Sequence, residues 1–343
     1  MTRSKLDRRS VLAGGAALAT GALLPSQASA KGNLTAAIYP GTWDEAYRAV
    51  VMPALKKAHD IDLALEPLFA VDQIVKAAAA RGLPPFDAFV LDPGPRATAV
   101  ERGLFEPFDA KKLSNLGKLP AGYSDQWGVA VNAQVVGIAY NPKKLPKPTS
   151  WKDLFTDPWV SRLGLTGFQT TFGTISLIEM AKIFGGSETD VEPIFAEIKK
   201  ILPKVAAVTP PAALPSLFQQ GQIDITYTNT NNISTLKSRG VDIELAIPDT
   251  GALTFITTMH IAKGAENKEN VYKYIDTVLS AGVQDVLMKP PSSMIPVNSE
   301  VTLVADMPVK KIEELAKFVT HDWTKINPQR AAWIERFNKE VTK

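Results

Sequence analysis

The pattern of apolar and polar positions along the chain predicts alternating strands and helices. In the first third, short apolar runs predict strands, and each is followed by a longer segment of helical period. Strands are predicted at 34–39, 61–68 and 86–91, and helices at 42–58, 71–81 and 96–103. Thr42-Trp43-Asp44-Glu45 has the sequence of a capping box and is predicted to open the first helix. This alternation is typical of α/β proteins.

The alternation continues through the rest of the chain, in which we find no tandem repeat. Two apolar runs, 127–131 and 135–140, predict two strands joined by a turn at Asn132. Further strands are predicted at 162–166, 223–227, 243–247 and 254–262. A further helix is predicted at 151–155, with Ser150 as its cap, and another after the polar run 228–232. The remaining helices are predicted at 171–184, 191–202, 212–220, 268–279, 282–288 and 310–341.

The first thirty residues have the organisation of an export signal. A basic segment ends in Arg8-Arg9, an alanine- and glycine-rich stretch covers 11–24, and Ala28-Ser29-Ala30 fits a cleavage site. The apolar stretch is shorter than the roughly twenty residues that span a bilayer. The adjacent arginines resemble a twin-arginine signal, and a general secretory signal is the alternative. We therefore expect residues 1–30 to be a signal peptide and the protein to begin near Lys31 in the periplasm.

Composition then excludes several classes of function. The 343 residues include no cysteine, which excludes disulfides, iron–sulfur clusters, thiolate zinc sites and cysteine nucleophiles, and they include only three histidines. We expect no cofactor and no metal. The formal net charge of +3 comes from the predicted signal, because 34 basic and 34 acidic residues remain after it. A balanced charge does not favour nucleic acid as a partner, and the length suits two domains.

Seven segments carry a resemblance to a known family. They are 39–43, 86–90, 102–109, 137–141, 148–154, 262–274 and 295–298. In this order, behind an export signal, they resemble the periplasmic solute-binding proteins of ABC importers, in the group that includes spermidine/putrescine binders. The resemblance covers essentially all of the chain after the signal. It implies a monomer that binds a small-molecule solute and delivers it to a membrane permease and its ATPase, without bond chemistry.

The resemblance also implies a fold and its division. The fold would be the type II-like α/β fold of two-domain periplasmic binding proteins, with a ligand cleft between the domains. Domain I would comprise 31–132 plus 253–301, and domain II 137–248 plus 307–343. A two-strand hinge would lie near 132–136 and 248–252, where Asp249-Thr250-Gly251 interrupts two apolar runs.

Candidate ligand-binding residues lie where predicted strands end and helices begin, because ligands of open α/β sheets bind there and helix N-termini favour anions. The candidates are Tyr39, Thr42, Trp43, Asp92, Phe168, Gln169, Thr170, Thr171, Tyr227, Asn229, Thr230, Asn231, Phe255 and Thr257. The aromatic members would provide flat walls for a ligand. The alternatives are plain helix capping by Thr42, Thr171 and Asn231, and core packing by the aromatic residues.

The residue chemistry bears on the charge of the ligand. Polyamine binders of the family typically use several carboxylates, whereas the matching stretches here carry hydroxyls and amides. Asp92 is the one well-placed carboxylate, with Asp44 second. An unpaired buried charge is unfavourable, so we expect a carboxylate-bearing, zwitterionic or neutral solute. A polyamine is the alternative, and an exported enzyme or a sensor-linked binding domain is a second one, although no Gly-x-Ser-x-Gly or His-Glu-x-x-His motif is present.

Overall fold

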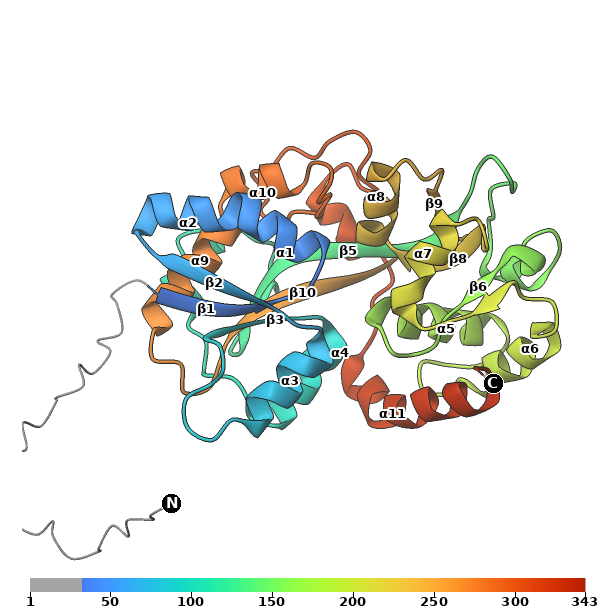
Figure 1. Cartoon of the computed structure of the whole chain (residues 1–343), viewed down its shortest axis with the longest axis horizontal. Coiled ribbons are helices and arrows are strands. Elements are labelled where there is room, and N and C mark those ends of the chain that lie inside the picture. The colour runs from blue at the N-terminus through green and yellow to red at the C-terminus, as the bar shows by residue number, and fades with distance from the viewer. Residues whose placement is uncertain (1–32, 343) are drawn as a thin grey trace, which may run out of the picture. The chain divides into compact units, whose positions relative to one another are not determined.

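The computed structural model describes residues 33–342 (Figure 1), and these belong to one compact unit. The predicted signal peptide lies outside the described residues. Within them, no helix has the length and apolar character needed to cross a membrane. The elements alternate as the sequence pattern predicts, and the long apolar runs become the strands of one large sheet.

The large sheet has eight strands and is mixed. Its order is β2-β1-β3-β10-β5-β4, with β8 and β9 both paired to β5. The bounds are β1 Asn33–Ile38, β2 Asp62–Pro67, β3 Ala88–Leu91, β4 Ser124–Asp125, β5 Gly128–Tyr140, β8 Ile225–Asn229, β9 Glu244–Ala246 and β10 Leu253–Ile261. The first three strands are parallel, and β10 runs antiparallel to both β3 and β5. A separate two-stranded sheet joins β6 (Gly164–Leu165) to β7 (Ala207–Val208).

The predicted turn at Asn132 is wrong, because β5 is one continuous strand. All thirteen residues of β5 are buried. The side chain of Asn132 is accommodated by donating from Nδ2 to the carbonyl oxygen of Ile295 at 3.2 Å. Figure 1 shows β5 and β10 running together from one half of this unit into the other.

The helices occupy nearly the predicted ranges. They are α1 Thr42–Ala46, α2 Met52–His59, α3 Ala70–Ala79, α4 Pro93–Glu101, α5 Thr171–Ile183, α6 Glu192–Ile201, α7 Leu214–Gln219, α8 Thr230–Ser238, α9 Lys268–Leu279, α10 Ala281–Leu287 and α11 Trp323–Glu340. A π-helical turn, Tyr47–Val51, joins α1 to α2. The predicted helical tail is two pieces, a 3-10 helix Ile312–Lys317 followed by α11.

The predicted cap at Ser150 forms, whereas the predicted capping box at Thr42 does not. Ser150 caps the 3-10 helix Trp151–Phe155, and Asp153 completes the box. At α1 the N-cap residue is Gly41, with a positive φ of 77°, and it makes no side-chain cap bond. The prediction at Thr42 fails because its hydroxyl is used elsewhere, in a 2.8 Å hydrogen bond with Thr235 of α8.

The buried apolar residues form separate clusters, which define the two halves. Lobe I is built around the strands β1–β3 with α1, α2 and α9, and its core includes Leu34, Val90 and Ile275. Lobe II is built around α5, α6 and β8, and α11 adds Trp333 and Phe337 to its core. A third cluster packs the 3-10 helix Ile312–Lys317 against β5 and the segment after α10. The sheet therefore links two cores.

Candidate functional site

Asp92 follows β3 at the edge of lobe I, where the predicted site begins. Its backbone N–H donates to the hydroxyl of Tyr39, which follows β1, at 2.9 Å. Thr257 of β10 donates from Oγ1 to Asp92 Oδ1 at 3.0 Å. Gln134 of β5 donates from Nε2 to the same threonine oxygen at 3.1 Å. A hydrogen-bonded chain thus runs from the crossing strands to the carboxylate.

The environment of Asp92 shifts its proton affinity upward. Burial raises the pKa of Asp92 from 3.8 to about 6, against hydrogen bonds from Thr257, Thr171 and Tyr39 and the charge of Arg330, which lower it. Burial also raises the pKa of Tyr39 well above its usual value, and the neighbouring Asp92 charge adds to this. Tyr39 therefore stays a neutral phenol, while Asp92 is largely ionised at pH 7.

Trp43 packs into lobe I beside these groups. Its ring stacks on Tyr47, with centroids 5.8 Å apart, and lies nearly perpendicular to the ring of Tyr39, with centroids 5.6 Å apart. Only 6% of Trp43 is exposed. Its surroundings are thus those of a core residue that borders the predicted site.

In lobe II, α5 and α8 are capped by residues other than Thr171 and Asn231. Thr170 caps α5 by accepting from the N–H of Gly173 at 3.1 Å, and Asn229 caps α8 by accepting from the N–H of Asn232 at 3.0 Å. The capping alternative for Thr171 and Asn231 is therefore wrong, since Thr171 and Asn231 are the first and second residues of their helices rather than the N-caps. Both side chains are buried and have other contacts.

Three predicted aromatic walls lie inside the lobe II core. Phe168 is fully buried and stacks on Phe195 at 5.8 Å between centroids. Tyr227 is also fully buried, and its hydroxyl bonds the backbone of Thr166 both as acceptor, at 3.1 Å, and as donor. Phe255 is 4% exposed in the same core. Core packing, the alternative raised from the sequence, accounts for the contacts of all three residues.

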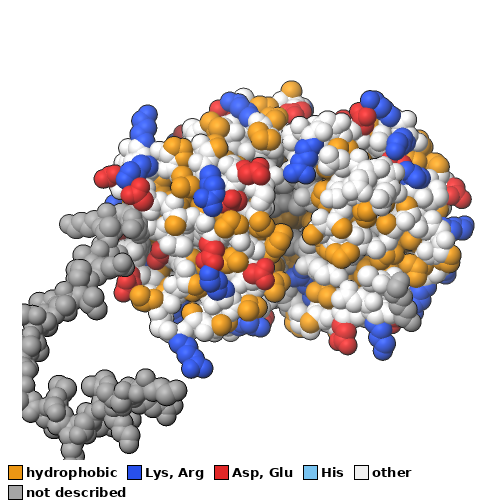
Figure 2. Space-filling model, viewed as in Figure 1, with side chains coloured by type: hydrophobic (Ala, Val, Ile, Leu, Met, Phe, Trp, Pro, Cys, Tyr) orange, Lys and Arg blue, Asp and Glu red, His pale blue; other side chains and the backbone are white. Residues whose placement is uncertain are grey.

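Further contacts, together with the covalent chain, extend these groups into a set from both lobes, which we call the inter-lobe ring. Besides the chain from Tyr39 to Gln134, the N–H of Val135 donates to Thr230 Oγ1 at 3.4 Å, and Thr235 donates to the carbonyl oxygen of Asn231 at 2.9 Å. Because the hydroxyl proton of Thr235 is used in this bond, its oxygen accepts from the hydroxyl of Thr42 in lobe I. The ring comprises Tyr39, Thr42, Asp92, Gln134, Thr230, Asn231, Thr235 and Thr257. Figure 2 shows a groove between the lobes on one face.

Arg330 of α11 is a site residue that the sequence analysis missed. Its Nε donates to the carbonyl oxygen of Phe168 at 2.9 Å and its Nη2 to that of Gln169 at 2.7 Å. Burial lowers the pKa of Arg330 to about 10, and the negative charge of Asp92 opposes this shift. The side chain of Gln169 itself turns away and donates to Asn338 at 3.0 Å. Arg330 therefore brings one cation near the one carboxylate of the ring.

The start of α11 also reaches lobe I. Asn327 donates from Nδ2 to the carbonyl oxygen of Gly94 in α4 at 2.8 Å. A Cβ atom added at Gly94 would lie 2.7 Å from the ring of Trp323, so the glycine permits this close approach. Trp323 lies against α4 beside Arg330, whose guanidinium is 5.6 Å from its ring centre.

One sequence signal could have revealed Arg330. Residues 323, 326, 330, 333 and 337 recur at the spacing of one helix face, and four of them are apolar. An arginine in such a stripe is a buried cation that needs partners. Its partners lie about 160 positions away in the sequence, and no local pattern identifies them.

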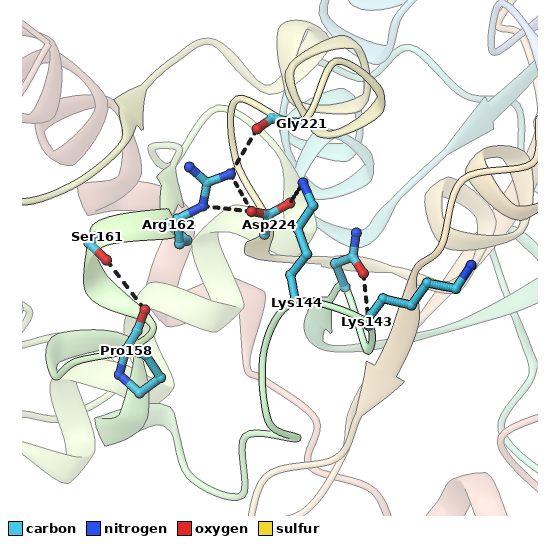
Figure 3. Close-up of polar contacts among 8 residues, drawn as sticks. Lys143, Lys144, Pro158, Ser161, Arg162, Gly221 and Asp224 are labelled. Carbon is cyan, nitrogen blue, oxygen red and sulfur yellow. Dashed lines mark hydrogen bonds and ion pairs between the residues drawn. The ribbon is translucent and has the colours of Figure 1, made fainter.

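A second charged cluster lies in lobe II, outside the ring (Figure 3). The carboxylate of Asp224 has 1% of its surface exposed and receives Nε of Arg162 at 2.6 Å and Nζ of Lys144 at 2.9 Å. Arg162 also donates to the carbonyl oxygen of Gly221 at 2.8 Å. These contacts join the start of β8 to the segments before β6 and after β5, so the cluster fixes the scaffold. Residues 33–342 contain no group of three or more acidic, histidine or cysteine side chains that could hold a metal ion.

Comparison with known proteins decides the family. A model of bacterial extracellular solute-binding proteins matches residues 51–317. The chain belongs to this family. It is thus a solute-binding protein of an ABC transporter, and its family and fold are those of transport proteins rather than enzymes.

Individual relatives are distant. An uncharacterized protein of Haemophilus influenzae is 26% identical over 261 residues, which cover 72% of this chain and 73% of that protein. The spermidine/putrescine-binding periplasmic protein of Escherichia coli is 25% identical over 201 residues, which cover 53% of this solute-binding protein and 55% of its relative. A solved ABC transporter structure from Clostridium perfringens superposes with a TM-score of 0.73, at 21% identity, over 90% of this chain and 99% of the other. The predicted two-domain periplasmic binding protein fold is confirmed.

Proposed function

We propose that this protein is exported to the periplasm and captures a small polar organic solute in the groove between its lobes. The inter-lobe ring carries this proposal, because it joins polar groups from both lobes around one carboxylate. The solute-bound form would then dock to a membrane permease served by an ATPase. The role needs no bond chemistry, and a monomer suffices for it.

The proposed solute is carboxylate-bearing, zwitterionic or neutral, with at most one ammonium group. Asp92 is the one acid of the ring, and Arg330 already supplies a cation to it. A spermidine-type solute would bring about three further positive charges, and each unpaired buried charge costs several kcal/mol. That cost offsets much of a micromolar binding free energy of about 8 kcal/mol. The named function of the Escherichia coli relative favours a polyamine, which remains the second candidate.

The proposed mechanism is closure about the crossing strands. A hinge near 132–136 and 248–252 would let the lobes separate, and contacts from both lobes to the solute would favour the closed form. Two hydrogen bonds would form only on closure, that of Thr42 with Thr235 and that of Asn327 with Gly94. The same closure would serve a sensor-linked binding protein. Genes for a permease and an ATPase next to the gene of this protein would favour import over that role.

The geometry revises the proposed set of binding residues. Tyr39, Thr42, Asp92, Thr171, Thr230, Asn231 and Thr257 remain, together with the edge of Trp43. Gln134 is added because it donates a hydrogen bond to Thr257, and Arg330 because its charge lowers the pKa of Asp92. Phe168, Tyr227 and Phe255 are more simply explained as core residues, and Gln169, Thr170 and Asn229 as structural partners of α11, α5 and α8.

A thermal-shift screen tests the proposal, because a solute that binds the native state raises the melting temperature by mass action. The screen would include polyamines, amino acids, organic acids, polyols and conjugates of sugars with amino acids. Hits would be titrated by calorimetry against the protein and against Tyr39→Phe. We expect one carboxylate-bearing or neutral class to bind and the variant to bind it more weakly. Micromolar binding of spermidine or putrescine would establish the polyamine alternative instead.

A further inference from the structure

Two buried amide side chains of the inter-lobe ring have one unsatisfied atom each. Gln134 is 3% exposed and Asn231 is 6% exposed. Their nitrogens are hydrogen-bonded, to Thr257 Oγ1 at 3.1 Å and to the carbonyl oxygen of Ser292 at 3.3 Å. Their oxygens, Gln134 Oε1 and Asn231 Oδ1, are buried and have no hydrogen-bond partner among residues 33–342.

The partners fix which end of each amide is free. The carbonyl oxygen of Ser292 can only accept, so it must face the nitrogen of Asn231. The hydroxyl proton of Thr257 goes to the carboxylate of Asp92, so its oxygen accepts from the nitrogen of Gln134. In both residues the free atom is therefore an acceptor.

Both acceptors adjoin the proposed solute position. Gln134 is two hydrogen bonds away from Asp92 through Thr257. Asn231 lies in the first turn of α8, whose Thr235 bonds to Thr42 of lobe I. The two amides thus come from the crossing strands and from lobe II. Native proteins satisfy nearly all buried polar groups, so these two oxygens require partners.

We propose that the solute itself provides these partners, with one hydroxyl or N–H donor to Gln134 Oε1 and one to Asn231 Oδ1. This inference rests on the proposed function and narrows its solute class. The solute would be a hydroxylated or amine-bearing compound with at least two donors, such as a polyol, an amino alcohol or an amino acid derivative. Compounds that offer only acceptors, such as sulfate or a simple dicarboxylate, would leave both oxygens unpaired.

Calorimetric titration of the full chain with matched probes tests this class. Mannitol, ethanolamine and serine would represent donor-bearing compounds, and succinate and sulfate would represent compounds without donors at neutral pH. We expect binders among the first group and none in the second. Tight binding of succinate or sulfate, unaffected by changes at Gln134 and Asn231, would overturn the inference.

Variants test the two oxygens themselves. Gln134→Met and Asn231→Leu remove each acceptor and keep an apolar side chain of similar size. Each should weaken the best donor-bearing binder at least tenfold, which corresponds to about 1.4 kcal/mol. Gln222→Met is the control, since Gln222 is an exposed residue outside the ring. Melting curves without solute would establish that each variant folds, and a structure of the complex would show donors within hydrogen-bond distance of both oxygens.

The outcomes separate this inference from the proposed function. A solute that binds the Tyr39→Phe variant poorly but binds Gln134→Met and Asn231→Leu as well as the unchanged protein would overturn only the donor assignment, and water would then satisfy the two oxygens. Failure of every probe, including the wider screen, would count against solute capture in this groove.

Discussion

Replacing Asp92 by asparagine should stabilise the solute-free protein at neutral pH. The folded state raises the pKa of this carboxyl from 3.8 to about 6, mainly by burial, so ionised Asp92 opposes folding. A shift of about two units corresponds to up to about 3 kcal/mol of the free energy of unfolding. Asparagine has no charge to desolvate and should recover most of this amount.

The sign of the pH dependence follows from the direction of the shift. Because the folded state binds the proton more tightly than the unfolded state, the unchanged protein gains stability as the pH falls through about 6 toward 3.8. The advantage of Asp92→Asn should therefore be largest above pH 7 and disappear near pH 4. Melting temperatures of both proteins, measured from pH 4 to pH 8, provide the comparison. Asp306→Asn, at an exposed acid, should show no such trend.

Two results would refute this reasoning. If Asp92→Asn melts at the same temperature as the unchanged protein at pH 7.5, burial of the carboxylate carries no free-energy cost. If its advantage is the same at pH 4 and pH 8, ionisation is not the cause. The variant also reports on the solute, because its affinity should fall only for a solute that carries an ammonium group.

Three further substitutions test the packing around the site. Trp43→Ala should lower the free energy of unfolding in urea by about 3–5 kcal/mol, because a buried ring is removed; unchanged stability would show that the ring is not part of the core. Gly94→Ala should displace α11, because the added Cβ would lie 2.7 Å from a ring atom of Trp323 in that helix. A red-shifted tryptophan emission and weaker solute binding are expected. Gly282→Ala is the control and should change neither, because its Cβ would have nothing within 4 Å. Arg162→Ala should cost about 1–3 kcal/mol, because it removes one of the two cations that pair with the buried carboxylate of Asp224. Lys143→Ala should stay within about 0.5 kcal/mol, and equal effects would contradict this account.

Much of the fold follows from the sequence because amphipathic periodicity is local. The helix Lys268–Leu279 has the bounds that its pattern predicts, and its buried face lies on lobe I. The same method divided β5 in two, because a strand buried on both faces shows no alternation and an asparagine in it resembles a turn. Only the carbonyl of Ile295, far along the chain, explains why that asparagine stays in the strand.

The site was less predictable than the fold. Asp92 could be identified from its place after a strand, because the ends of parallel strands gather at one edge of a sheet. The sequence pattern assigns Phe168 and Tyr227 to the same kind of position, yet both face the core. No local signal distinguishes an aromatic residue that lines a site from one that packs in the core. Arg330 was missed because its role depends on where α11 returns in space.

The order of strands in the large sheet has a consequence for how the chain is made. Strand β10 lies between β3 and β5, yet it is synthesised only after all of lobe II except α11. While residues 141–252 emerge from the ribosome, which takes about 5–20 seconds at typical rates, β3 and β5 each lack a neighbour. Unpaired strand edges favour aggregation. The nascent lobe I would therefore depend on chaperones, or on fast folding of lobe II, until the last central strand arrives.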